Sequence, residues 1–229
     1  MTLLADYPVR RRDEHLALHG DLPPTHRGRL LAELDESGLA GRGGAGFPTA
    51  RKIRAVAGRR RAIVVANGTE GEPESAKDEV LLELSPHLVI DGVLVASRVV
   101  GAREAVIAVG DAATGAHDSL LAALADRPDA GAIRVVDVPD RFVAGEESAL
   151  VNYVGGGGAL PTITPPRPAE RGVRGRPTLV QNVETLAALA LLARRGADRF
   201  RAEETHLATV RGAVRRAGVV EVRPTVTVA

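Results

Sequence analysis

Residues 62–67 read AIVVAN, a short and almost wholly apolar run between three arginines and the loop GTEGEP. Runs of this kind are typical of strands buried on both faces of a parallel sheet. Two similar runs follow, EAVIAVG at 104–110 and AIRVVDV at 132–138, and the amphipathic stretch 116–127 lies between them. Strands that alternate with helices predict an α/β layered domain on a parallel sheet.

Helices are predicted around these strands. The stretch HRGRLLAELDES carries a leucine face, with Thr25 as its cap and Gly38 as its end. A short helix is expected to start at Pro48 and to end at Gly58, and longer ones cover 86–101 and 183–200. The Val- and Thr-rich tail from His206, broken by Gly218, predicts a hairpin that begins a β-rich unit.

Glycine is concentrated in the stretch GLAGRGGAGFPTARK at 38–52, which ends on one of only two lysines in the chain. Gly41, Gly43 and Gly46 match G-x-G-x-x-G, but the loop follows a predicted helix, whereas a dinucleotide-binding loop of the Rossmann type follows a strand. Bare backbone can still approach a flat or anionic ligand, and Lys52 could reach a phosphate. A tight turn without a ligand is the alternative interpretation.

Three further polar motifs follow along the chain. NGTEGEPESAKDE places Glu70 and Glu72 after the carboxyl end of the first strand, where α/β sheets bind ligands, although a solvated acidic loop has the same pattern. In FVAGEESALVNY, Glu146 and Glu147 begin a helix, a position that also suits acids electrostatically. In GRPTLVQNVET, Gln181 and Asn182 end a short strand and can offer donors and acceptors to a heterocycle.

Composition excludes several function classes. The chain has 229 residues, 45% of them hydrophobic, and a net charge of +1 from 30 Lys+Arg and 29 Asp+Glu, so nucleic-acid binding is not expected. It has no cysteine, and its six histidines show no metal-ligand spacing, so we predict no metal site and no iron–sulfur ligation in this chain. Without an apolar run long enough to span a membrane or act as a signal peptide, we expect a cytoplasmic protein.

The four motifs, in this order from Gly38 to Phe200, resemble the flavin-binding domain of the 51 kDa subunit of respiratory complex I and its relatives in NAD-linked hydrogenases and formate dehydrogenases. The resemblance implies a Rossmann-like FMN-binding domain, followed by a ubiquitin-like (SLBB-type) β domain and a helical bundle with a cysteine-bound iron–sulfur cluster. It divides the chain into an N-terminal helical segment (1–37), the FMN domain (38–203) and the incomplete start of the ubiquitin-like domain (204–229). We therefore expect a fragment or a shortened relative.

The same resemblance implies an NADH dehydrogenase of the NADH:quinone type, in which a hydride passes from NADH to FMN and electrons then leave for iron–sulfur partners. The expected partner is a thioredoxin-like 24 kDa iron–sulfur subunit, and membrane association is expected only through a larger complex. Glu72, facing the nicotinamide, and Glu147 are the predicted catalytic residues. The predicted cofactor-binding residues come from all four motifs: Gly41, Arg42, Gly43, Gly44, Gly46, Phe47, Lys52, Asn67, Glu70, Gly145, Glu146, Gln181 and Asn182.

The chain departs from the family pattern at several positions. Thr69 stands for an Asp, Gln181 for an Asn, Phe142 for a Tyr and Ala144 for a Cys. At the positions that correspond to aromatic residues flanking NADH, the chain has Ala55 and Arg167, with only Phe47 retained.

These departures predict a site that suits flavin better than NADH. Two alternatives stay open: the FMN domain of a ferredoxin-linked, sodium-pumping complex with another donor, and a cofactor-free subunit scaffold.

Overall fold

A parallel sheet of four strands forms the centre of the molecule, as the apolar runs predict. The computed structural model describes residues 2–5 and 7–225. Its strands are β1 (Ile63–Gly68), β2 (Glu104–Gly110), β3 (Ile133–Val138) and β4 (Thr178–Asn182), in the order β3-β2-β1-β4. All three pairings are parallel, and the register sets Asn67 of β1 beside Ala108 of β2 and Asn182 of β4.

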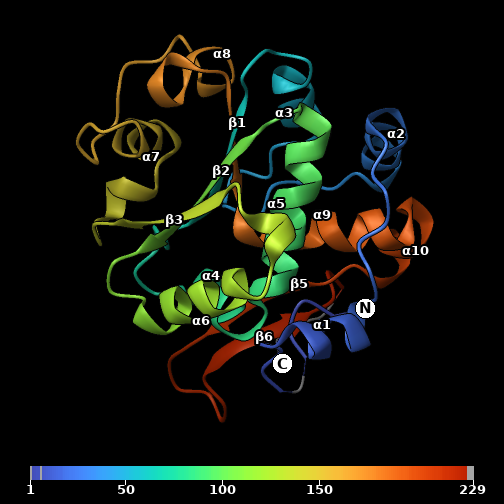
Figure 1. Ribbon diagram of the computed structural model, residues 1–229. Helices are drawn as coiled ribbons and strands as arrows, with labels where there is room; N and C mark the ends of the chain where they lie inside the picture. The colour runs from blue at the N-terminus through green and yellow to red at the C-terminus, as the bar shows by residue number, and fades with distance from the viewer. Residues whose placement is uncertain (1, 6, 226–229) are drawn as a thin grey trace.

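Each strand contributes side chains to two separate cores, because successive residues point to opposite faces. In β1, Val64 and Ala66 join the larger core, whereas Ile63 and Val65 join the smaller one. The larger core includes α4 (Lys77–Leu84), α5 (Pro86–Val100), α6 (Thr114–Ala125) and α9 (Val183–Arg195). The smaller core includes α7 (Glu147–Val154), and α7 lies with α8 (Pro168–Arg171) across the sheet from α5 and α9 (Figure 1). The prediction of an α/β fold with flanking helices is confirmed.

The helix boundaries differ from the sequence prediction at several places; the helix expected from Pro48 to Gly58, for example, is α3 (Thr49–Val56). The helix α2 (Arg27–Ser37) has His26, not Thr25, as its N-cap, and it ends as expected at Gly38, which has a left-handed backbone. The predicted single helix over 183–200 is wrong: Gly196, with φ +75°, separates α9 from α10 (Ala197–Glu203). Glycine adopts such a φ without steric cost, so the apolar pattern continues across a break in the backbone.

The remaining α-helices and strands lie at the ends of the chain and before β1. They are α1 (Arg12–His19) and α3 (Thr49–Val56) and the antiparallel strands β5 (His206–Val210) and β6 (Gly218–Val222). The expected hairpin is confirmed. It is joined to the main domain by Leu207, whose N–H donates to Glu184 Oε1 at 2.9 Å, and by Ala76, whose N–H donates to Thr209 Oγ1 at 3.0 Å. The division of the chain into three segments and the ubiquitin-like identity of the hairpin stay predictions.

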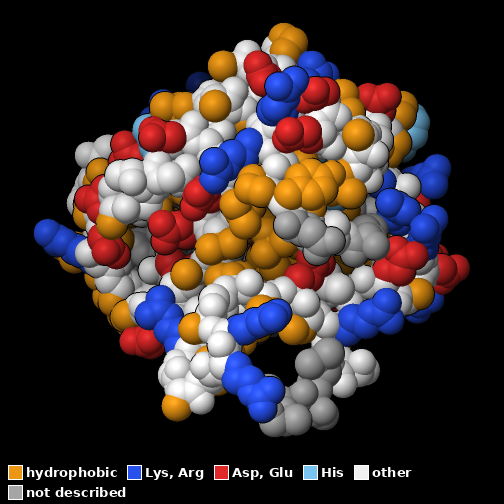
Figure 2. Space-filling model, turned by 90° about the horizontal axis from the view of Figure 1, so that it is seen from below, with side chains coloured by type: hydrophobic (Ala, Val, Ile, Leu, Met, Phe, Trp, Pro, Cys, Tyr) orange, Lys and Arg blue, Asp and Glu red, His pale blue; other side chains and the backbone are white. Residues whose placement is uncertain are grey.

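The hairpin side of the molecule is not flat. Figure 2 shows this face from below, with hydrophobic side chains gathered in a central hollow and acidic and basic side chains around it. Within the described residues, no single helix is long and apolar enough to cross a membrane; α4 and α5 meet the length and composition criteria only as a pair, which is bent by 98°.

Candidate functional site

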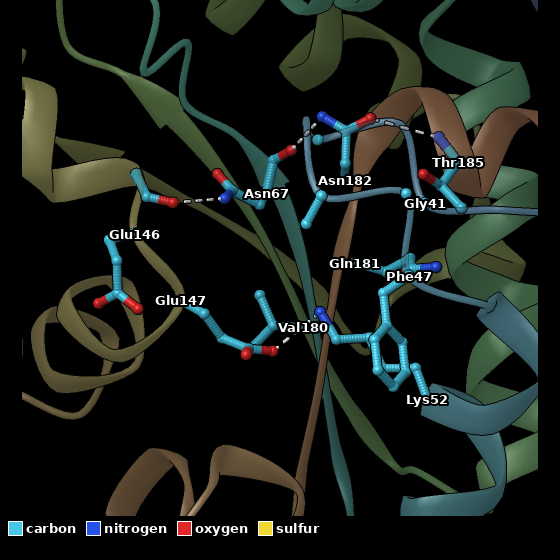
Figure 3. Close-up of a pocket in the computed structure, with 14 residues that line it drawn as sticks. Gly41, Phe47, Lys52, Asn67, Glu146, Glu147, Val180, Gln181, Asn182 and Thr185 are labelled. Atoms are coloured by element: carbon cyan, nitrogen blue, oxygen red, sulfur yellow. Dashed lines mark hydrogen bonds and ion pairs between the residues drawn. The ribbon is translucent and has the colours of Figure 1, made fainter. Parts of the chain in front are cut away.

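A cavity of about 340 Å³ opens between the carboxyl ends of β1 and β4. The chain runs from β1 outward to β2 and β3 and then returns to place β4 on the other side of β1, so this is the switch point of the sheet. Open α/β sheets characteristically bind ligands at this point. Residues from all four sequence motifs line the cavity (Figure 3): Gly41, Gly43, Ala45, Gly46, Phe47, Lys52, Asn67, Gly145, Glu146, Glu147, Val180, Gln181, Asn182 and Thr185.

The glycine loop forms one wall and closes on itself. The N–H of Gly41 donates to the carbonyl of Phe47 at 2.8 Å, and Ala40 forms a bridge with Pro48. Gly44 and Gly46 have φ of +97° and +59°, and a Cβ on either would meet no atom within 4 Å. These two glycines are therefore required by the backbone conformation and not by crowding. From the sequence, the glycines indicated either a tight turn or a bare backbone that a ligand could approach. The structure has both: the loop turns tightly, and its backbone lines the cavity.

Lys52 and Glu147 face each other across the cavity. Lys52 lies in α3 and Glu147 begins α7, and their Nζ and Oε1 atoms are 2.9 Å apart (Figure 3). Both side chains are about one-third exposed, so the pair contributes little to stability. The ammonium group is the cation of this cavity that a phosphate could reach.

The amides hold the walls of the cavity together. Asn67 donates from Nδ2 to the carbonyl of Gly145 at 2.8 Å, which ties β1 to the segment before α7. Asn182 accepts the N–H of Glu184 at its Oδ1 as the N-cap of α9, and its Nδ2 donates to Asp78 Oδ2 at 2.6 Å. Gln181 donates to Thr49 Oγ1 at 3.1 Å. The predicted amide residues do line the cavity, but their side chains already bond to the protein.

Gly145 and Glu146 form the opposite wall. A Cβ on Gly145 would stand 2.8 Å from Thr69 Oγ1, so the close approach of these two segments needs a glycine. Glu146 is the N-cap of α7 and accepts the N–H groups of Ser148 and Ala149 at 2.9 and 3.1 Å. Burial alone would raise the pKa of Glu146, but these bonds and the Ser148 hydroxyl hold it below its usual value.

A buried cluster of charged side chains adjoins the cavity through Asn182, which donates to Asp78, and Arg42 is the one predicted site residue that belongs to it. Lys77 Nζ contacts Asp78 Oδ1 at 2.6 Å and Glu184 Oε2 at 3.0 Å. Burial raises the pKa of Asp78 to about 7, although Lys77 opposes the shift. The sequence signal that could have indicated this cluster is Lys77, one of only two lysines in the chain, directly before Asp78.

Arg42 belongs to this cluster and not to the cavity lining. Its guanidinium is buried and pairs with Glu184 at 3.1 Å and Glu204 at 3.0 Å, while its backbone N–H donates to Thr185 Oγ1. Since Leu207 also donates to Glu184, the cluster connects the glycine loop to the hairpin. Of the predicted cofactor-binding residues, Arg42, Gly44 and Glu70 are those that do not line the cavity.

Glu70 and the predicted catalytic Glu72 line a second cavity of about 450 Å³, at the ends of β1 and β2. Glu79, Asp140 and Phe142 also border it. Glu70 accepts the N–H of Asp78 at 2.9 Å, so it contacts the wall between the two cavities. The structure thus separates Glu72 from Glu147, the other predicted catalytic residue. Of the residues at the NADH-flanking positions, only Phe47 lines the first cavity; Ala55 and Arg167 are exposed and line neither.

Comparison with known proteins identifies the domain. Residues 34–191 match the family model of the Nuo51 FMN-binding domain. The chain is 32% identical over 186 residues to a subunit of the NADH-quinone oxidoreductase of Aquifex aeolicus, covering 75% of this chain and 44% of that relative. It is also 32% identical over 216 residues to the alpha subunit of the NAD-reducing hydrogenase HoxS of Cupriavidus necator, covering 85% and 36%.

Solved structures agree with this. A chain from the H2-reduced NAD+-reducing [NiFe]-hydrogenase superposes with a TM-score of 0.81 at 33% identity, over 95% of this chain and 39% of that one. The air-oxidized form of such an enzyme gives a TM-score of 0.79 at 34% identity, over 86% and 36%. This chain spans less than half the length of these relatives. The glycine loop, the paired Lys52 and Glu147 and the strand-end amides lie within the matched segment, and the chain belongs to the Nuo51 FMN-binding domain family.

Proposed function

We propose that this chain binds FMN in the cavity between β1 and β4 and serves as the electron-input domain of an NADH dehydrogenase of the NADH:quinone type. The observation that carries the proposal is the convergence of a glycine loop, one accessible lysine and helix α7 at the switch point of the sheet. The volume of about 340 Å³ falls in the range of small-molecule sites.

The lining residues fit a flavin nucleotide. Bare backbone at Gly43 and Gly46 leaves room for a planar ring, and the Val180 and Phe47 side chains offer apolar contact. Lys52 would exchange its contact with Glu147 for the phosphate, since a charge-assisted bond to a dianion is stronger than an exposed ion pair. FMN held by these residues would supply the capacity to take up two electrons from a nicotinamide and to release them singly, and the protein would supply position and electrostatics.

The NADH donor and the partner subunits belong to the proposal. The relatives are named as an NADH-quinone oxidoreductase subunit and as a subunit of an NAD-reducing hydrogenase, which supports a nicotinamide as donor and a multi-subunit assembly. A 24 kDa thioredoxin-like iron–sulfur subunit as the electron acceptor, a cytoplasmic location and a catalytic role for Glu72 and Glu147 are further parts of this proposal.

Flavin fluorescence titration of the purified chain tests the proposal. We expect about one FMN per chain, and Lys52→Ala should weaken binding roughly ten- to a hundredfold, because a charge-assisted contact is lost. Arg54→Ala is the matched control, since it removes a cation from the same helix that pairs with Asp35 on the surface. No FMN binding at micromolar concentrations, or equal affinity for Lys52→Ala and the wild type, would refute the flavin site.

A further inference from the structure

The opposite edge of the sheet carries a cavity that the flavin site does not use. It has a volume of about 570 Å³ and lies at the amino ends of three strands. Arg61 stands two residues before β1, Arg103 directly before β2 and Arg176 two residues before β4. Six of its nine lining residues are arginines: Arg27, Arg59, Arg60, Arg61, Arg103 and Arg176, with Gly58, Val100 and Gly101.

Backbone carbonyls hold three of these arginines in place. Arg27 donates from Nε to the carbonyl of Val99 at 2.7 Å, Arg59 to that of Ala55 at 2.9 Å and Arg176 to that of Arg61 at 2.8 Å. Gly58 and Gly101 lie next to the Arg27 guanidinium. A Cβ on Gly58 would stand 3.8 Å from one of its terminal nitrogens, and a Cβ on Gly101 would stand 3.5 Å from the other. The guanidinium groups of Arg27 and Arg59 are thereby oriented without acidic partners.

Positive charge in this cavity is compensated at only one point. Arg176 pairs with Glu104 at 2.6 Å, and Glu104 is shared with Arg174 and, at 4.0 Å, Arg134. Within the described residues, the side chains of Arg60, Arg61 and Arg103 form no hydrogen bond or ion pair. Some surface arginines elsewhere pair with acids, as in Arg10–Glu83, Arg54–Asp35 and Arg199–Glu203, whereas others, such as Arg141 and Arg195, have no acidic partner among the described residues. What distinguishes this cavity is the convergence of several unpaired arginines from separate segments on one hollow.

The lining also restricts the kind of ligand. Arginine presents a planar array of donors that suits phosphate oxygens in a bidentate arrangement. The cavity has no aromatic side chain, and its one larger apolar residue, Val100, is buried. It therefore lacks both a surface for stacking a base and the apolar anchors that protein interfaces need. We propose that this cavity binds a compact polyphosphate anion, recognised through its phosphates alone.

Isothermal titration of the full chain with sodium tripolyphosphate at low ionic strength tests this inference. We expect one anion per chain, an affinity that falls as salt is added, and a loss of at least about tenfold in the double variant Arg60→Gln/Arg103→Gln. Arg215→Gln/Arg216→Gln is the matched control, because it removes the same charge from the exposed connection between β5 and β6 and should change the affinity less than about twofold.

Further ligands identify the source of the phosphates. ATP binding as tightly as tripolyphosphate, with no binding of adenosine, supports recognition of the phosphates of a nucleotide as well as of the inorganic ion; tripolyphosphate binding alone restricts the site to the inorganic ion. The absence of binding at millimolar tripolyphosphate, or equal losses in the two double variants, overturns the proposal. FMN titration of Arg60→Gln/Arg103→Gln should be unchanged, which separates this site from the flavin cavity and checks the fold.

Discussion

The two cavities on either side of the end of β1 differ in charge and in construction. The cavity toward β4 has a glycine loop, a lysine and amide side chains, and its acids are engaged: Glu146 caps α7 and Glu147 pairs with Lys52. The cavity toward β2 has four acids, Glu70, Glu72, Glu79 and Asp140, and its arginine, Arg211, pairs with Glu74 at 3.2 Å. Lys52 gives the first cavity a cation for the phosphate of an anionic cofactor, whereas the four acids of the second cavity repel such a ligand.

The difference follows from the topology. Strand β4 returns on the far side of β1, so the loop before α3 and the start of α9 meet only at the β1–β4 crevice. The two cavities nevertheless share a wall, because Asp78 receives a bond from Asn182 of the first cavity and donates its N–H to Glu70 of the second. Neighbouring strand ends of one sheet therefore differ in the ligand charge that they favour, and variants in each cavity measure this difference.

The largest effect is expected when a glycine of the first cavity gains a side chain. A Cβ on Gly43 would stand 3.4 Å from Asn182 Cβ, so Gly43→Val should fill part of the cavity and weaken FMN binding roughly a hundredfold. Gly71→Val, in the second cavity, is the control: its Cβ would stand 3.7 Å from the nearest carbonyl oxygen, and FMN affinity should be kept. Equal effects of both variants in fluorescence titration would show that the cavities do not differ in this way.

Asn182→Ala should destabilise the fold, because this amide caps α9 and bonds to Asp78. We expect a loss of about 2 kcal/mol in the free energy of unfolding, measured by urea denaturation. Asn182→Ser restores an oxygen for the cap but not the bond to Asp78, so it should recover part of the loss. If Asn182→Ala is as stable as the wild type but no longer binds FMN, then the Asn182 side chain contacts the ligand and does not stabilise the wall of the cavity.

The shared wall predicts a pH dependence of stability. Burial raises the pKa of Asp78 from 3.8 to about 7, so the folded protein keeps a proton there that the unfolded chain releases. The contribution of Asp78 to the free energy of unfolding should therefore fall as pH rises from about 4 to 7, and stay constant above that.

Urea denaturation of Asp78→Asn against the wild type, at several pH values, measures this contribution. We expect the variant to gain stability relative to the wild type across this window, because an asparagine has no carboxyl group that the folded protein must keep protonated. Parallel stability profiles of the two proteins would mean that Asp78 does not titrate in this range.

The smallest effect on flavin is expected for Glu72→Gln. Because Glu72 lines the second cavity, FMN affinity should change less than about twofold. Stopped-flow reduction of the bound flavin by NADH then tests its proposed catalytic role, with Glu79→Gln as a control from the same cavity. A large loss of FMN affinity in Glu72→Gln would join the two cavities into one site.

Local patterns in the sequence were sufficient for most of the secondary structure. The run 104–110 is β2 itself, and AIVVAN became β1 with its boundaries shifted by one residue. Such strands can be predicted because burial on both faces requires a continuous apolar run. The break at Gly196 was not predictable from hydrophobicity, because the residues on both sides keep the helical apolar pattern while the backbone changes direction.

Part of the candidate site was predictable because the apolar runs mark the strands and therefore also the strand ends. Residues at the carboxyl ends of strands, such as Asn67 and Asn182, had to meet at the same edge once the sheet was parallel. The function of their side chains was not predictable, since a hydrogen-bond partner 104 residues away, as in Asn182 and Asp78, leaves no local signal. Arg42 shows the same limit: it stands inside the glycine motif, yet two distant glutamates hold its guanidinium in the interior.

By itself the sequence determined the parallel α/β fold, the glycine loop with its lysine, and the membership of the chain in a flavin-binding family, because these depend on short patterns and their order. Only the tertiary structure decided which strand ends share a cavity. The return of β4 beside β1 separates Glu72 from Lys52, pairs Lys52 with Glu147, and brings six arginines from distant segments to the opposite edge. Strand order depends on the packing of the whole chain, and no single segment of the sequence encodes it.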